Sequence, residues 1–251
     1  MSAPEGIDWS WAVSTGGALS SRQRRQLLTP LLRTVVSYSV CRTRLALGRR
    51  GTDGVDIDRL RWPDSALARA AEEEIRDTLS ADIVAHSYRT YLFALSLAAL
   101  DGASVDEELC YVACLLHDLN LAVPTPGRCF AVVGGERAEQ FALARGESAQ
   151  RSAAIGAAIA AHITVGASED LSDPGGFVSA GAFVDVSGTR IDELAPGWVE
   201  GLLTRYPRHD FKRRLTTYFS DEAKAVPAGR ARWLNRTAGF PILVRMAPFP
   251  E

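Results

Sequence analysis

Apolar residues recur every three or four positions along most of this chain, and runs that alternate apolar with polar residues are nearly absent. That spacing is typical of helices that bury one face, because strands alternate with a period of two. Capping residues and helix breakers predict helices near residues 64–79, 80–101, 106–119, 136–145, 148–162, 177–187, 198–205 and 210–224. With no internal repeat, the chain is predicted to be an all-α protein.

The N-terminal segment follows a different pattern from the rest. Residues 1–19 are rich in glycine and serine and are predicted to be irregular, with Trp9 and Trp11 packing onto the body. A helix is expected after Ser20 or Ser21, although Pro30 makes its continuity uncertain. Its arginines are expected to face solvent and its leucines to face inward (Arg22, Arg24, Arg25; Leu27, Leu28, Leu31, Leu32). We therefore expect residues 1–62, which end in a loop over 48–63, to be an extension that packs on a main domain at 63–251.

Composition narrows the class of protein. Hydrophobic residues make up 47% and charged residues 23% of the chain, which is ample for a buried core, and no apolar stretch is long enough to span a bilayer. A net charge of -2 gives no reason to expect nucleic acid or a membrane as partner. Four cysteines without a Cys-x-x-Cys pair, and no signal-like N-terminus, favour a reducing cytoplasm. Abundant arginine and alanine suggest a GC-rich bacterial genome, and a homo-oligomer stays possible.

The candidate chemistry lies in four residues. The adjacent pair His117 and Asp118 ends an apolar helical run, His86 precedes it, and Asp185 follows it. Two imidazoles and two carboxylates suit one divalent metal. Neighbouring helical residues point about 100° apart, so the pair can share an ion only near a helix end. The alternatives are a dipole-stabilised helix end for the pair, a core histidine at His86, and an ion pair of Asp185 with Arg190.

The segments around these residues carry a resemblance to a known family. They read HSYRTYLFA (86–94), CLLHDLNL (114–121), FAVVGGERA (130–138), AIAAHITVG (158–166), VDVSG (184–188) and YPRHDFK (206–212). In this order they resemble the HD-domain superfamily, most closely its cyanamide-hydratase-like branch, over residues 63–219. The resemblance implies an all-α HD fold in which His86, His117, Asp118 and Asp185 bind one divalent metal. It makes residues 63–251 the catalytic domain.

That branch implies zinc and the addition of water to a nitrile carbon, whereas other HD branches hydrolyse phosphate esters or bind two irons. Two-metal members place two further histidines between the pair and the last aspartate. Here only His162 lies in that interval, so one metal is expected. The leading hypothesis is a metal-dependent hydratase or hydrolase that adds water to a small carbon–nitrogen substrate. Asp118 would shuttle a proton, His162 would transfer protons or contact substrate, and Arg89 would anchor the substrate or, more in keeping with its position, hold Asp118 or Asp185.

Several alternatives stay open at this point. The enzyme could hydrolyse a phosphomonoester or nucleotide at a single metal, with Arg89, Arg128 or Arg137 as phosphate contacts. It could act on a larger nitrogen-containing metabolite, with residues 1–62 shaping the pocket, or it could be a non-catalytic binding domain. Zinc is the expected metal, but iron(II), manganese and nickel suit the same donors. Cys110 and Cys114 are expected in the core and His209 at the surface.

Overall fold

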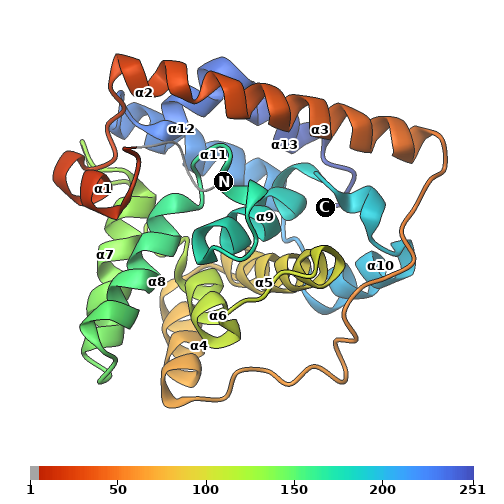
Figure 1. Ribbon diagram of the computed structural model, residues 1–251, viewed down its shortest axis with the longest axis horizontal. Coiled ribbons are helices and arrows are strands. Elements are labelled where there is room, and N and C mark those ends of the chain that lie inside the picture. The colour runs from red at the N-terminus through yellow and green to blue at the C-terminus, as the bar shows by residue number, and fades with distance from the viewer. Residues whose placement is uncertain (1–5) are drawn as a thin grey trace.

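The computed structural model describes residues 6–251, and every regular element in that range is helical (Figure 1). The all-α prediction is confirmed. At the centre, α5 (Ala81–Asp101) packs along α9 (Pro174–Ser187). The surrounding helices are α4 (Ala66–Thr78), α6 (Glu107–Leu116), α7 (Phe130–Leu143), α8 (Ala149–Ala161), α10 (Pro196–Arg205) and α11 (Phe211–Ala225), with short 3₁₀ turns η1 (Ala167–Glu169) and η2 (Ile191–Glu193) beside α9. None of the helices in this range combines the length and apolarity that a bilayer crossing requires.

The close approach of α5 and α9 depends on a glycine. A Cβ at Gly181 would lie 1.9 Å from the carbonyl oxygen of Thr90, so only a residue without a side chain fits there. Asp185 lies one turn after Gly181, and His86 lies one turn before Thr90. The contact therefore holds these two side chains opposite each other across the helix pair.

Two predictions near α7 were wrong. Gly135 does not precede the helix but lies inside α7, where its would-be Cβ is 2.6 Å from the Gly156 carbonyl oxygen on α8 and 3.1 Å from the Trp9 ring. Trp9 belongs to a short helix, α1 (Trp9–Thr15), within the segment expected to be irregular. Asp8 caps α1 by accepting the Trp11 backbone N–H at 2.8 Å. The tryptophans do pack on the body, as expected.

The predicted N-terminal helix is divided into α2 (Ser21–Gln26) and α3 (Leu28–Ala46), which run along one edge of the molecule (Figure 1). Pro30 lies in the first turn of α3, where its missing N–H is not needed. The expected inward orientation of the leucines is only partly correct. Leu27 is buried, but Leu28 and Leu32 are exposed, because α3 turns Pro30 and Cys41 towards the body instead.

The C-terminal region holds more helix than the sequence indicated. After α11, which agrees with the predicted 210–224 helix, the chain forms α12 (Arg230–Trp233), the π-helical turn η3 (Leu234–Ala238) and α13 (Phe240–Met246). Gly239, at a φ of 61°, joins η3 to α13. These short elements bring Leu234 and Phe240 over the interior between α9 and α11.

Candidate metal centre

Two of the candidate histidines occupy equivalent positions at helix ends. His117 is the C-cap of α6 and His162 is the C-cap of α8. The Nδ1 of His117 donates to the Cys114 carbonyl at 2.7 Å, and that of His162 donates to the Ile159 carbonyl at 2.6 Å. A carbonyl oxygen only accepts, so each ring carries its proton on Nδ1 and leaves Nε2 bare. The expected placement of the His–Asp pair at a helix end is met.

His86 is oriented in the same way by a carboxylate. It lies in the second turn of α5, and its Nδ1 is 2.7 Å from Oδ2 of Asp185 on α9. Because an ionised carboxylate accepts, Nδ1 carries the proton and Nε2 faces away from Asp185. The ring stacks on Phe211 of α11, with centroids 4.5 Å apart. Three separate helices thus present three bare Nε2 atoms.

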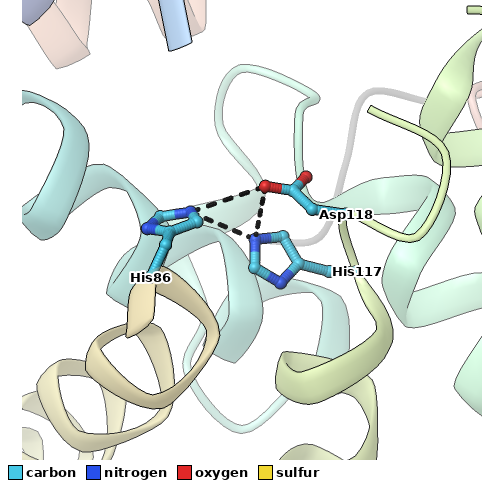
Figure 2. Close-up of side chains that lie close together, drawn as sticks. All are labelled: His86, His117 and Asp118. Carbon is cyan, nitrogen blue, oxygen red and sulfur yellow. Dashed lines mark hydrogen bonds and ion pairs between the residues drawn. The ribbon is translucent and has the colours of Figure 1, made fainter. Parts of the chain in front are cut away.

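The structure brings His86, His117 and Asp118 together (Figure 2). The two Nε2 atoms are 3.2 Å apart, and Oδ2 of Asp118 lies 3.4 Å from His117 Nε2 and 3.7 Å from His86 Nε2. A single ion bonded to two donors at about 2.0–2.2 Å in tetrahedral geometry would hold them about 3.4 Å apart. Two imidazole nitrogens and one carboxylate oxygen at these separations therefore fit one divalent cation. His162 is adjacent, with its Nε2 3.9 Å from the other Asp118 oxygen.

The two bare nitrogens bring two lone pairs close together, and a shared cation would relieve their repulsion. Neither Nε2 carries a proton in the neutral rings, so two lone pairs would oppose each other at 3.2 Å. Protonating one ring would relieve this repulsion. However, burial lowers the pKa of His117 and holds that of His162 well below the usual range, since charge is costly away from water. A metal ion satisfies both lone pairs without charging either imidazole.

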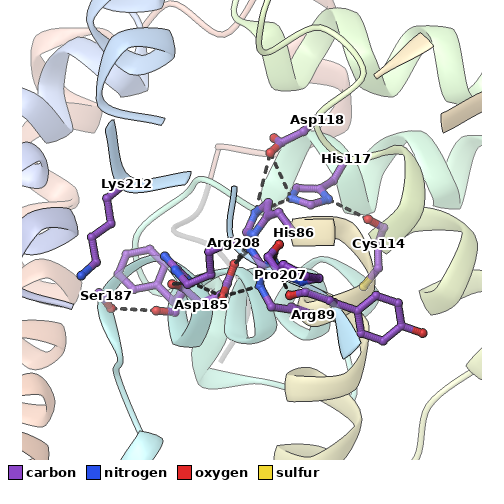
Figure 3. A network of polar contacts seen from close by, with 12 residues as sticks. His86, Arg89, Cys114, His117, Asp118, Asp185, Ser187, Pro207, Arg208 and Lys212 are labelled. Carbon is purple, nitrogen blue, oxygen red and sulfur yellow. Dashed lines mark hydrogen bonds and ion pairs between the residues drawn. The ribbon is translucent and has the colours of Figure 1, made fainter. Parts of the chain in front are cut away.

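Asp185 does not join this group (Figure 3). Its carboxylate is fully buried and lies at the Nδ1 side of His86, where it also accepts two hydrogen bonds from Arg89 at 2.8 Å and one from Arg208 at 2.6 Å. Burial opposes ionisation, but the two guanidiniums hold the pKa of Asp185 well below its usual value. These donors occupy both oxygens, so the structure places Asp185 behind His86 and not among the candidate ligand atoms. Nor is it paired with Arg190, which binds Asp101 and Glu193.

Arg89 is therefore part of the support of His86. It is completely buried, and besides Asp185 it donates to the carbonyls of Tyr206 and Pro207 at 3.0 Å. Arg208, which the sequence reasoning did not single out, has the same function from the other side of Asp185. In the sequence, Arg208 is marked only by its place in the segment YPRHDFK, beside His209. His209 itself is exposed, as expected. Cys110 and Cys114 are buried and unbonded, also as expected.

The donor group opens onto a small cavity. Its volume is about 30 Å³, enough for roughly one water molecule. Beyond the four polar residues the walls are apolar and come from α8–α9, α11 and the C-terminal elements (Ile163, Ala182, Phe183, Val186, Leu215, Phe219, Leu234, Phe240). Among the described residues that line it, none is lysine or arginine. The arrangement can hold a cation with one small uncharged ligand, of about the size of water, beside it.

Comparison with known protein families identifies part of the chain. Residues 83–180 match a family model described as HD domain. The matched stretch contains His86, His117, Asp118 and His162. It supports the HD-domain superfamily, whose members are typically metal-dependent hydrolases, and together with the donor cluster it indicates an enzyme that binds a divalent metal. Comparison with curated proteins found no match.

Proposed function

We propose that this HD-domain protein adds water to the carbon–nitrogen multiple bond of a small, uncharged, nitrile- or cyanamide-like compound. The observation that carries the proposal is the small cavity of about 30 Å³ beside the donor residues, whose walls are apolar apart from those residues themselves. A small neutral molecule can enter such a space at little desolvation cost. A larger nitrogen-containing metabolite would have to displace several packed side chains.

We propose that His86, His117 and Asp118 hold one divalent ion, with zinc as the preferred metal. Three protein ligands with one open position are typical of catalytic zinc sites. When bound, the ion would polarise the substrate and make water more acidic. Asp185 then acts through His86: its hydrogen bond to Nδ1 fixes the tautomer and aims Nε2 at the ion.

We assign the proton transfers to His162 and Asp118. The Nε2 of His162 is bare and lies beside the Asp118 carboxylate, so it can accept a proton as the water oxygen bonds to the substrate carbon. The same proton then returns to the substrate nitrogen, which gives an imidic acid or isourea. Transfer of the hydroxyl proton to that nitrogen, through the same base, gives the amide- or urea-type product with no net change at the protein. Burial holds the pKa of His162 well below its usual range, so its ring is neutral at neutral pH.

Hydrolysis of a phosphomonoester is disfavoured by the positions of the arginines. A phosphate ester carries a charge of about -1.5 to -2 at neutral pH and is normally held by guanidiniums or ammoniums. Arg89 is bound to Asp185, Arg128 to Glu136 at 2.6 Å, and Arg137 to the Asn120 side chain at 2.9 Å. None of the three lines the cavity. The proposed substrate is therefore neutral.

The test measures hydration and phosphate release side by side. Protein loaded with zinc is incubated with cyanamide, with small nitriles and with nucleotide monophosphates, while product and free phosphate are measured. His117→Ala should abolish hydration and metal retention. His209→Asn is the matched control, because His209 is an exposed histidine that also precedes an aspartate, and it should leave both unchanged. Phosphate release that depends on His117, with no hydration of any nitrile, would overturn the proposal.

A further inference from the structure

The helix α3 presents an apolar stripe to solvent. Its members are between 44% and 69% exposed, although they are all aliphatic (Leu28, Leu32, Val35, Val36, Val40, Leu47). Successive members are one, three, four or seven residues apart, with Leu47 at the C-cap, so they share one side of the helix. On the opposite side, Pro30 and Cys41 are buried against the body. The helix is thus apolar on two faces, and only one of them is covered by residues 6–251.

The stripe contains no charge. On the same side of the helix, Ser39, Thr43 and Ala46 lie between the aliphatic members. A helix that merely covered a core would place charged residues on its solvent face. Here the arginines lie elsewhere: Arg33 pairs with Glu169 at 3.1 Å, and Arg44 pairs with Asp192 at 3.3 Å, both on the body. No member of the stripe is charged over the full length of α3.

The area is sufficient for a symmetric interface. Six aliphatic side chains, each about half exposed, present roughly 500 Å² of apolar surface, near the largest patch found on ordinary monomers. Two such stripes in contact would bury roughly 1,000 Å², and the intervening hydroxyl residues bring the total near the ~1,200 Å² at which stable interfaces begin. A second copy of this chain therefore matches the size of the patch.

The order of side chains along the stripe is self-complementary when the second helix runs antiparallel. Leucines stand at both ends of α3, and smaller residues stand in the middle. A two-fold axis through the middle would place Leu28 opposite Leu47 and bring Val36 near Ser39 of the second copy. Large residues would then meet at the ends, while small ones allow the backbones to approach at the centre.

We propose that α3 pairs with α3 of a second copy to form a two-fold dimer. The positive charge of this segment opposes the approach of a second copy, since residues 9–52 contain eight arginines and no acidic residue. A basic amphipathic helix can also bind an anionic membrane surface. The dimer is favoured because Arg33 and Arg44 are already paired on the body and the stripe itself is short of the large aromatic anchors typical of membrane helices.

The experiment measures the mass of the full chain in solution by light scattering after gel filtration, over roughly 1 to 100 µM protein. Wild type is expected at twice 27.1 kDa. Val36→Glu should raise the dimer dissociation constant by at least about 100-fold, because it buries a carboxylate without a partner. Val123→Glu is the matched control: this valine is 74% exposed outside α3, and its replacement should leave the dimer intact.

A second measurement tests the orientation independently of stability. Ser39→Cys should form a disulfide between two copies under mild oxidation, whereas Val123→Cys should not, since every natural cysteine is buried. A wild-type mass of 27.1 kDa at all concentrations would overturn the proposal. So would a dimer that Val36→Glu leaves unchanged, or a monomer that sediments with phosphatidylserine vesicles through α3.

Discussion

A single methyl group at Gly181 should separate the two central helices and disturb the metal centre without touching any polar residue. The added Cβ would lie 1.9 Å from the Thr90 carbonyl oxygen and 2.9 Å from the Ala94 Cβ, where an ordinary contact is about 3.4 Å or more. The helices must therefore move apart by about 1.5 Å. Such overpacking costs about 3 kcal/mol, offset by less than ~1 kcal/mol from the better helix propensity of alanine.

The same movement reaches the site one turn away. The His86 Nδ1–Asp185 Oδ2 distance of 2.7 Å would grow beyond hydrogen-bond range, and the ring would lose the contact that aims Nε2. Loss of such a supporting hydrogen bond lowers metal affinity by roughly 10- to 100-fold. Gly181→Ala is thus expected to lower both the free energy of unfolding and the affinity for zinc.

Urea denaturation followed by circular dichroism measures the first effect, and competition with a chelating dye measures the second. Gly201→Ala is the control, because Gly201 is helical, exposed and has no atom within 4 Å of its would-be Cβ. That variant should be neutral or stabilised by ~0.5–1 kcal/mol. If Gly181→Ala matched Gly201→Ala in stability and retained wild-type zinc affinity, the packing argument for the α5–α9 contact would be refuted.

Three further outcomes are expected. Asp185→Asn should destabilise the fold by about 3–5 kcal/mol in urea titrations, because it leaves Arg89 buried without a counter-charge and leaves Arg208 with Glu251 as its remaining acidic partner; a loss below ~1 kcal/mol would contradict this. Burial raises the pKa of Glu222 to about 6 from an ordinary 4.5. The stabilising contribution of this carboxyl group is therefore complete below pH 4.5 and is lost as the pH rises through 6. Glu222→Gln should be more stable than wild type by about 2 kcal/mol at pH 8 but not at pH 4. Removal of metal with a chelator should lower the melting temperature, and zinc at about 100 times its dissociation constant should restore about 2.7 kcal/mol, an effect that His117→Ala should lack.

The apolar periodicity was enough to predict the helical class and most helices of the body, because amphipathic spacing is a local property. The His117–Asp118 pair could also be placed at a helix end, and the structure puts His117 at the C-cap of α6. Local signals failed where packing partners decide the outcome. Gly135 looked like a helix breaker, yet it lies inside α7. A glycine is needed there because α8 and Trp9 leave no room for a side chain.

The supporting shell of the site shows the same limit. Asp185, Arg89 and Arg208 come from three distant segments, and the sequence alone could not show that their contacts with one another would draw Asp185 to the back of His86. Nor could the spacing on α3 show which of two apolar faces would meet the body, so the inward orientation of Leu28 and Leu32 was wrong. Both outcomes depend on which helices become neighbours.

By itself, the order of residues determined an all-α protein with one imidazole on one helix and an adjacent imidazole and carboxylate at the end of another, because helix periodicity, capping and donor chemistry are set within short stretches of chain. Only the tertiary structure decided that two Nε2 atoms and one carboxylate oxygen meet within 3.2–3.7 Å, that Asp185 lies behind them, and that the cavity beside them is small and apolar. Those features arise from the packing of α5 on α9 and from the C-terminal turns that cover them. Interactions between residues remote in sequence set such distances, and no local pattern specifies them.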